Sequence, residues 1–265
     1  MTIGQIANDQ PEIGKSVLPG YRSSVAMATA IAAEPRVLLI LPCFNEEEMV
    51  GDVLDEIDNL ALDYDTVVVD DGSSDATYDI ARPITKTVRL PHNLGIGGAV
   101  QTGIKYAERA GYDFCVQIDG DGQHPPEGVA ALLKAYREAP SDIIIGSRYL
   151  LNDTFRSTWS RRLGSQLIAA TLGWLFHTEP VTDPTSGMRL MNRKAIAFFA
   201  RRYPQDFPEP ISLAWALRKG LTVSETPVEM RPRYTGRSSI YGLKPIAYML
   251  RVLGYIALAR IARMR

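Results

Sequence analysis

Residues 113–124 read Asp-Phe-Cys-Val-Gln-Ile-Asp-Gly-Asp-Gly-Gln-His, an apolar run that stops at two aspartates set among glycines. A short apolar run bounded by turn residues is typical of a buried strand. The carboxylates of Asp119 and Asp121 can converge on one cation, because hard divalent ions such as Mg²⁺ and Mn²⁺ prefer oxygen ligands. Gln123 offers a third oxygen. His124 could add a ligand or shape the turn, and an ordinary acidic turn is the alternative for the whole stretch.

Short apolar runs alternate with helical segments on both sides of this stretch. The pattern predicts strands at 37–41, 66–69, 86–90, 113–118 and 142–145, and helices at 47–60, 98–110 and 127–138. Such alternation predicts an α/β fold, a mostly parallel, Rossmann-like sheet with helices on both faces. Beyond residue 150 the alternation weakens, and we expect helices at 159–176 and 210–219 and strands at 186–191 and 221–230.

The unusual sequences fall where the predicted parallel strands end. In a doubly wound sheet, ligands bind at this carboxyl edge. Four such ends should therefore meet at one site, namely 42–46, 70–74, 119–124 and 146–149. The adjacent carboxylates of Asp70 and Asp71 would repel each other unless a cation, backbone amides or a nucleobase N–H took their charge. Glycines at 95–98 lack the full Gly-x-Gly-x-x-Gly spacing, which argues against a nicotinamide cofactor.

The bulk composition indicates a globular protein without disulfides. The chain has 265 residues, of which 46% are apolar and 22% charged. Cys43 and Cys115 both lie in apolar runs and suit buried hydrophobes in a reducing cytoplasm. Residues 1–34 lack the features of a secretory signal and should form a poorly ordered extension. No apolar stretch reaches the roughly 20 residues of a spanning helix, so we expect no membrane crossing by this chain itself.

Six motifs, taken in order, resemble those of glycosyltransferase family 2. They are Pro42-Cys-Phe-Asn-Glu46, Asp70-Asp-Gly-Ser73, Asn93-Leu-Gly-Ile-Gly-Gly98, Asp119-Gly-Asp-Gly-Gln-His-Pro-Pro-Glu127, Gly146-Ser-Arg-Tyr149 and Thr185-Ser-Gly-Met-Arg189. Within the family they are similar to the dolichol-phosphate mannosyltransferase and polyprenyl-phosphate glycosyltransferase branch. The resemblance implies a GT-A fold, a UDP- or GDP-linked sugar donor, Mg²⁺ or Mn²⁺, inversion at the anomeric carbon and a polyprenyl phosphate acceptor.

The resemblance also implies roles for individual residues on the donor side. The nucleoside would be held by Pro42, Phe44, Glu46, Val69 and Asp71, and the metal and diphosphate by Asp119, Asp121 and Gln123. In this scheme a metal held by Asp121 stabilises the leaving diphosphate as the glycosidic bond breaks.

On the acceptor side, the resemblance implies a phosphate contact for Arg148 and an acceptor-phosphate site at Arg161 and Ser165, where Arg162 could replace Arg161. An acceptor phosphate is already an anion and can attack without a strong base, whereas a sugar hydroxyl needs a carboxylate base. Asp183 is the candidate for that base or for orienting the acceptor, and a turn aspartate before a proline is the alternative.

The C-terminal end of the chain is basic. Residues 231–265 carry eight Lys and Arg side chains and no acid, although the whole chain has a formal net charge of −1. Arg231, Arg233 and Arg237 suit phosphate oxygens, unless they form only a solvated loop. Residues 241–265 predict a basic amphipathic helix that lies on anionic lipid. The alternative is a helix packed on the protein or in a homo-oligomer interface.

These features divide the chain into an extension at 1–34, a catalytic domain at 35–240 and a C-terminal helix at 241–265. We expect a cytoplasmic enzyme, peripheral at the inner face of the cell membrane and attached directly or through a membrane partner protein. No nucleic-acid partner is expected.

Two other enzyme classes compete with this interpretation. An enzyme of the same fold could extend a glycan by transfer to a sugar hydroxyl. A nucleotidyltransferase that makes a nucleotide sugar would also use acidic metal ligands, but it should show a glycine-rich basic loop directly after the first strand. Residues 42–46 are not such a loop.

Overall fold

The computed structural model describes residues 34–60, 62–150, 159–231 and 244–261. Residues 35–265 form one compact unit. The predicted N-terminal extension lies almost entirely outside the described residues, as do Arg233, Arg237 and the side chain of Arg161.

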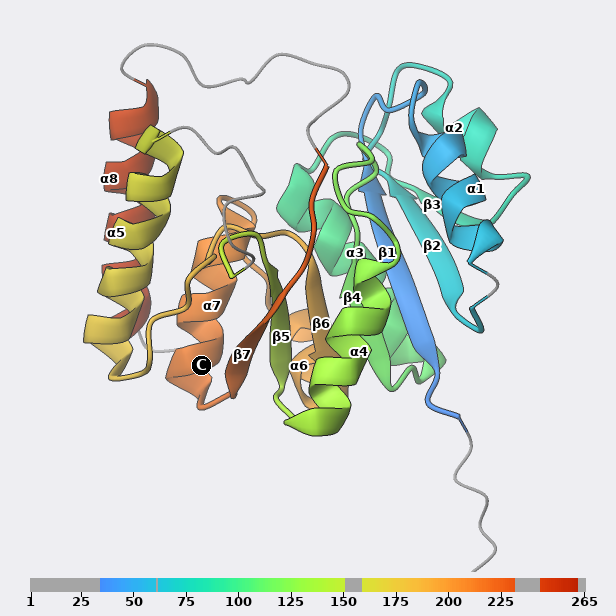
Figure 1. The fold of residues 1–265 in the computed structure, drawn as a ribbon. Helices are drawn as coiled ribbons and strands as arrows, with labels where there is room; N and C mark the ends of the chain where they lie inside the picture. Colours follow the sequence, from blue (N-terminus) through green and yellow to red (C-terminus); the bar gives the residue numbers. More distant parts are fainter. Residues whose placement is uncertain (1–33, 61, 151–158, 232–243, 262–265) are drawn as a thin grey trace, which may run out of the picture. The chain divides into compact units, whose positions relative to one another are not determined.

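A seven-stranded sheet in the order β3-β2-β1-β4-β6-β5-β7 carries the site (Figure 1). Its strands are β1 (Val37–Cys43), β2 (Asp65–Asp70), β3 (Lys86–Arg89), β4 (Phe114–Gln117), β5 (Ile143–Ser147), β6 (Arg189–Asn192) and β7 (Val223–Pro227). Only β6 is antiparallel to its neighbours, β4 and β5, among the described strands. The carboxyl ends of β1, β2, β4 and β5 therefore lie at one edge, as the sequence predicts.

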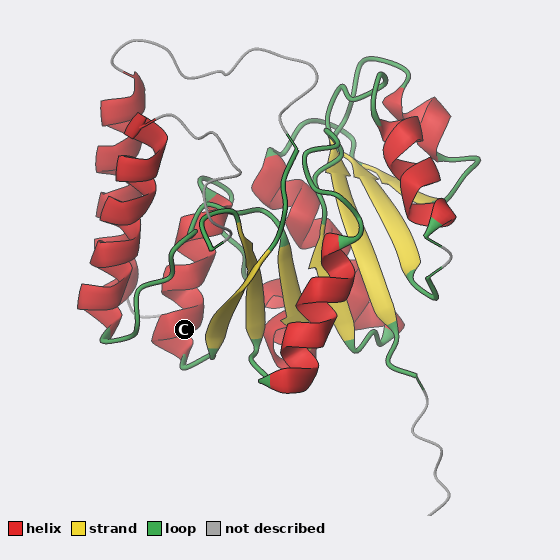
Figure 2. Cartoon of the chain, in the orientation of Figure 1, coloured by secondary structure: helices red, strands yellow, loops and turns green. Residues whose placement is uncertain are grey.

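Helices cover both faces of the sheet (Figure 2). They are α1 (Val50–Asn59), α2 (Thr77–Ala81), α3 (Ile96–Ala110), α4 (Gly128–Glu138), α5 (Trp159–Phe176), α6 (Arg193–Arg201), α7 (Pro208–Lys219) and α8 (Lys244–Ile261). The predicted α/β fold is confirmed, and the predicted elements differ from the observed ones at their ends. Helices α2 and α6 were not predicted.

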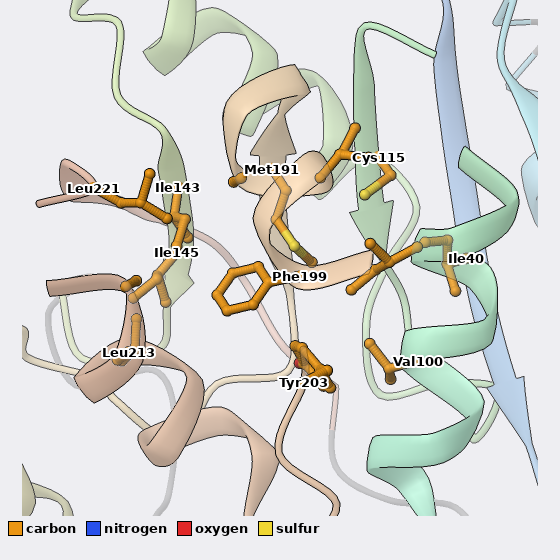
Figure 3. Close-up of a cluster of buried hydrophobic side chains, with 14 of the residues drawn as sticks. Ile40, Val100, Cys115, Ile143, Ile145, Met191, Phe199, Tyr203, Leu213 and Leu221 are labelled. Atoms are coloured by element: carbon orange, nitrogen blue, oxygen red, sulfur yellow. The ribbon is translucent and has the colours of Figure 1, made fainter. Parts of the chain in front are cut away.

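The two cores follow from the alternation of side chains along the central strand. Leu38 and Ile40 of β1 pack into one core, with α3, α6 and α7. Leu39 and Leu41 point to the other face, where α1 and α4 cover them. In the first core, Phe199 of α6 lies among side chains from several elements (Figure 3).

Helices α5 and α8 lie side by side and run in the same direction. A Cβ on Gly164 would come within 2.8 Å of Met249 Cε, and Arg260 Nε donates to the Leu175 carbonyl at 3.0 Å. The inner face of α8 belongs to the first core, because Val252 and Ile256 are fully buried there. One face of the predicted tail helix is therefore packed on the protein. No helix in the described part of the chain is long and apolar enough to cross a membrane.

Candidate active site

A pocket of about 530 Å³ lies at the carboxyl edge of β1, β2 and β4. Six of the predicted site residues line it, namely Pro42, Phe44, Glu46, Asp71, Asp119 and Asp121. They come from three strand ends that are far apart in the sequence and neighbours in the sheet. Three of the four predicted strand ends therefore meet at this cavity, whereas no residue of the fourth, 146–149, lines it.

Two predicted donor-site residues do not line this pocket. Val69 is 0% exposed and belongs to the hydrophobic core. Gln123 is absent from the pocket lining, and its backbone carbonyl accepts a hydrogen bond from the Arg231 N–H at 3.0 Å. The Arg231 guanidinium donates to both carboxylate oxygens of Glu56 at 2.8 Å, so the start of the basic segment is tied to α1.

The charges of the adjacent acids Asp70 and Asp71 are balanced within the protein. Asp70 lies 3.1 Å from Arg89 Nε and accepts a hydrogen bond from the Ser73 N–H. Asp71 Oδ1 accepts from the Leu94 N–H at 2.8 Å. Burial raises the pKa of Asp71, and the backbone N–H groups of Leu94 and Gly95 oppose that rise. The Arg89 guanidinium therefore balances the charge of Asp70, and backbone N–H groups stabilise the charge of Asp71.

Asp119 and Asp121 form the acidic wall of the pocket. Asp119 Oδ1 accepts from Gln117 Nε2 at 3.2 Å, and Asp121 Oδ1 accepts from the Gln123 N–H at 3.1 Å. His124 Nδ1 accepts from the Asp119 N–H, so this nitrogen shapes the turn. Within the described ranges, no three His, Cys, Asp or Glu side chains gather around a point that a metal could occupy. The protein thus offers two carboxylates that face an open cavity.

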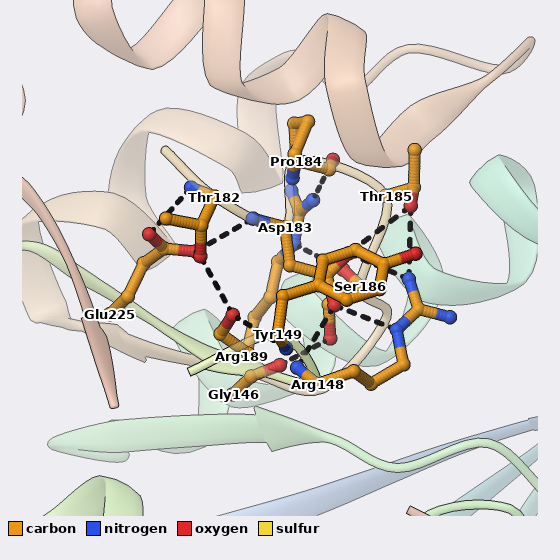
Figure 4. A network of polar contacts seen from close by, with 11 residues as sticks. Gly146, Arg148, Tyr149, Thr182, Asp183, Pro184, Thr185, Ser186, Arg189 and Glu225 are labelled. Atoms are coloured by element: carbon orange, nitrogen blue, oxygen red, sulfur yellow. Dashed lines mark hydrogen bonds and ion pairs between the residues drawn. The ribbon is translucent and has the colours of Figure 1, made fainter. Parts of the chain in front are cut away.

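Arg148 and Asp183 form a buried ion pair (Figure 4). Asp183 is 0% exposed and receives two hydrogen bonds from the guanidinium, at 2.7 Å from Nε and 2.6 Å from Nη2. Thr185 Oγ1 accepts a third at 2.9 Å, and the Asp183 N–H donates to Glu225. Burial lowers the pKa of Arg148, but the Asp183 carboxylate outweighs it and the net shift is upward. The geometry therefore favours Asp183 as the group that orients Arg148. It disfavours Asp183 as a base that faces solvent.

The predicted acceptor residues are only partly described. Ser165 in α5 is 3% exposed, and its hydroxyl has no hydrogen-bond partner among the described residues. Arg162 is exposed, with its guanidinium carbon 5.7 Å from the centre of the Tyr149 ring. Arg161, Arg233 and Arg237 stay predictions, because their side chains lie outside the described residues.

Glu209 is a pocket residue that the sequence analysis missed. It lies in the first turn of α7 and lines the pocket together with Asp119 and Asp121. Its sequence context, Phe207-Pro-Glu-Pro210, indicates only the start of a helix. Nothing local could have shown that this helix begins at the pocket.

The segment that leads into α7 packs on the start of α3 through Gly97. A Cβ on Gly97 would overlap the Pro204 carbonyl oxygen and lie 2.7 Å from Gln205 Cα. We expect Gly97→Ala to lower the free energy of unfolding by roughly 1–3 kcal/mol, because backbone atoms must move. The free-energy cost of this overlap should exceed the roughly 1 kcal/mol by which alanine is favoured over glycine inside a helix.

Gly51→Ala in α1 is the matched control, since its Cβ would lie 3.5 Å from Ile80 Cγ2, an ordinary contact. This variant should be up to about 1 kcal/mol more stable than the parent chain. Urea denaturation followed by circular dichroism measures both changes. Equal effects of the two substitutions would contradict the close packing at Gly97.

Residues 38–198 match the family described as Glycosyl transferase family 2. Polyprenol monophosphomannose synthase of Mycolicibacterium smegmatis is 29% identical over 260 residues, which cover 94% of this chain and 98% of that protein. UDP-N-acetylglucosamine–dolichyl-phosphate N-acetylglucosaminyltransferase of Methanococcus voltae is 29% identical over 221 residues, 74% of this chain and 86% of that protein.

Among solved structures, glucosyl-3-phosphoglycerate synthase from Mycobacterium tuberculosis, in complex with Mn²⁺, UDP and phosphoglyceric acid, has the same GT-A fold. The TM-score is 0.64 at 21% identity, over 86% of this chain and 79% of that one. The predicted fold and family are both confirmed. The chain belongs to glycosyl transferase family 2, and it is a GT-A glycosyltransferase that resembles the polyprenyl-phosphate branch of that family.

Proposed function

We propose that this enzyme moves a sugar from a UDP- or GDP-linked donor to a polyprenyl phosphate, with inversion at the anomeric carbon. The observation that carries the proposal is an acid-lined pocket beside an oriented cation. Arg148 donates a hydrogen bond to Thr185, and a Cβ on Gly187, two residues further on, would lie 3.1 Å from both Asp119 carboxylate oxygens. One anion site and one metal-compatible site therefore adjoin each other, as transfer between two phosphate-bearing substrates requires.

On the donor side, the pocket residues suit a nucleotide diphosphate. Phe44 is 45% exposed and offers its ring to the cavity, and Asp71 lines the same wall. Asp119 and Asp121 fit Mg²⁺ or Mn²⁺, because such ions take one or two carboxylates and complete their shell with phosphate and water oxygens. Bound there, the ion would supply Lewis-acid stabilisation of the leaving diphosphate. Gln123, whose backbone N–H donates to Asp121 Oδ1, is a further candidate ligand.

On the acceptor side, Arg148 is the group we assign to the phosphate. A guanidinium binds phosphate oxygens through two parallel hydrogen bonds, and Asp183 fixes the orientation of its plane. A phosphate acceptor carries its negative charge near neutral pH and needs no base. This agrees with the burial of Asp183, which does not face solvent as a base would. Ser165, Arg161, Arg233 and Arg237 are proposed as further acceptor contacts.

Two relatives support the lipid acceptor by name, since the mycobacterial protein is a polyprenol monophosphomannose synthase and the methanococcal protein acts on dolichyl phosphate. The decisive experiment supplies a panel of radiolabelled UDP- and GDP-sugars with undecaprenyl phosphate and Mn²⁺ or Mg²⁺, with and without EDTA. We expect a metal-dependent product that extracts into organic solvent. Consumption of donor without a lipid product would contradict the acceptor assignment and redirect the search to sugar hydroxyls.

We also propose that the outer faces of α5 and α8 rest on anionic lipid, so that the enzyme works at the inner face of the cell membrane. Neither helix contains Asp or Glu. Large apolar side chains are exposed on both, with Trp174 at 76%, Leu250 at 67% and Ile261 at 75%. Arg251 and Arg260 lie among them, and each basic residue near an anionic leaflet contributes about 1 kcal/mol.

A double variant, Leu250→Ser with Leu258→Ser, tests this surface without disturbing the packed face of α8. We expect binding to phosphatidylglycerol-containing vesicles to fall at least about tenfold, because each exposed leucine contributes on the order of 1 kcal/mol when it enters lipid. Co-sedimentation measures the binding. Ile84→Ser is the control, because Ile84 is 49% exposed but lies between α2 and β3. Unchanged vesicle binding, or a loss of self-association instead, would overturn the lipid assignment in favour of a homo-oligomer or a membrane partner protein.

A further inference from the structure

We propose that Glu209 selects the sugar, because its carboxylate accepts hydrogen bonds from hydroxyl groups of the sugar being transferred. The proposal rests on the donor and acceptor sites assigned above and adds a residue that determines specificity. It follows from the position of Glu209 in the pocket, from the way its backbone is held, and from the chemistry of a carboxylate facing a sugar.

Glu209 occupies a wall of the pocket that no other element supplies. Every other described residue that lines the cavity comes from the chain up to Asp121, around the ends of β1, β2 and β4 and the start of α3. Glu209 comes from α7, which crosses to the pocket from the second half of the chain. Glu209 therefore brings a side chain from the second half of the chain to the pocket that holds the proposed nucleotide site.

Packing also connects the start of α7 to both charged sites. Arg189 binds the Glu209 carbonyl and the carbonyls of Pro184 and Ser186, in the segment that carries Asp183, and a Cβ on Gly187 of that segment would lie 3.1 Å from both Asp119 carboxylate oxygens. Asp119 belongs to the proposed diphosphate site and Arg148 to the proposed acceptor site. In direct transfer, the sugar must lie between the diphosphate that leaves and the phosphate that attacks. Glu209 borders that space.

The backbone of Glu209 is held by hydrogen bonds, whereas its carboxylate forms none with another side chain of the described residues. Its carbonyl accepts hydrogen bonds from Arg189 Nη1 at 2.8 Å and from Ser212 Oγ at 3.0 Å. Arg189, 2% exposed, also donates to the carbonyls of Pro184 and Ser186. Arg189 thus fixes the start of α7 against the segment that carries Asp183. In the described part of the chain, the Glu209 carboxylate accepts a hydrogen bond from its own backbone N–H and from no side chain.

A carboxylate in this position can discriminate between sugars. A carboxyl group accepts hydrogen bonds from sugar hydroxyls in either protonation state, and when it is protonated it can also donate one. A site built to bind a hydroxyl rejects a sugar that lacks it or presents it in the other orientation, because the protein group then stays unpaired. Burial raises the pKa of Glu209, and Arg189 opposes that rise. Epimers that differ at one hydroxyl should therefore react at different rates.

The experiment compares Glu209→Gln with the parent enzyme in two steps. Calorimetry with Mn²⁺ first measures the binding of UDP and GDP, which lack the sugar. Kinetics then measure kcat/KM for pairs of epimeric donors, UDP-glucose against UDP-galactose and GDP-mannose against GDP-glucose. We expect nucleotide Kd to stay within about threefold, kcat/KM for the preferred donor to fall about ten- to hundredfold, and the preference within its epimer pair to fall at least about tenfold.

Two further variants separate selectivity from folding. Glu209→Asp keeps the charge but withdraws it by one methylene, and it should give an intermediate loss of preference. Asp206→Asn removes an exposed carboxylate three residues earlier and should change neither binding nor preference. An unchanged epimer preference in Glu209→Gln would overturn the inference, as would an equal loss of UDP and UDP-sugar binding. If the parent enzyme bound neither nucleotide, the proposed function itself would fail, and this inference with it.

Discussion

Asp121→Asn is expected to lower sugar transfer at least about a thousandfold while leaving the fold intact, because it removes one of the two charges that we propose hold the metal beside the leaving diphosphate. Asp121 is 7% exposed and its Oδ1 accepts a hydrogen bond from the Gln123 N–H. An asparagine side-chain oxygen can still accept that bond, so the local turn should persist. What the variant loses is charge at the pocket wall.

The measurement pairs the transfer assay with Mn²⁺-dependent nucleotide binding. We expect binding of UDP or GDP to become nearly independent of Mn²⁺ in the variant, as it should in the parent enzyme treated with EDTA. Asp63→Asn makes the same chemical change at an exposed position before β2, where we expect full activity. Near-normal turnover of Asp121→Asn would refute the metal assignment.

Asp183→Asn should lower the free energy of unfolding by roughly 3 kcal/mol, because it leaves a largely buried guanidinium without its counter-charge. Asp183 is 0% exposed and the Arg148 side chain is 21% exposed in their ion pair. The same change releases the orientation of Arg148, so transfer should also fall, chiefly through a higher KM for the acceptor. Chemical denaturation and acceptor kinetics measure the two effects separately.

Asp79→Asn removes the carboxylate of a second ion pair and serves as the comparison. The Arg82 and Asp79 side chains are 59% and 65% exposed, and exposed pairs contribute less than about 1 kcal/mol. This variant should therefore lie within about 0.5 kcal/mol of the parent chain. If both variants changed stability by the same small amount, the pair of Arg148 and Asp183 could not have the anchoring role assigned to it.

Much of the donor side of the site was predictable. Asp119 and Asp121 follow an apolar run whose strand character is local, and parallel strands bring their carboxyl ends to one edge whatever the intervening sequence. Val69 differs from these two residues. The resemblance implied a nucleoside contact for it, but alternation along β2 turns its side chain into the core.

The acceptor side was harder to predict, because its residues act through partners distant in the chain. The local sequence indicates only a turn aspartate before a proline at Asp183. Its ion pair with Arg148, 35 residues away, is visible only in the tertiary structure. The C-terminal helix likewise has an apolar pattern on most of its surface. Its contact with α5 and α7 decides which face is packed, and the pattern alone could not.

The sequence by itself determined the alternation of strands and helices along the chain except for α2 and α6, the α/β class and the acids at the strand ends. Each of these follows from side-chain periodicity and turn chemistry within a few residues. Only the tertiary structure decided that β6 runs antiparallel, that Arg148 is paired with Asp183, and that α7 brings Glu209 to the pocket. These are contacts between distant segments, and they depend on how the core packs as a whole, which no local pattern encodes.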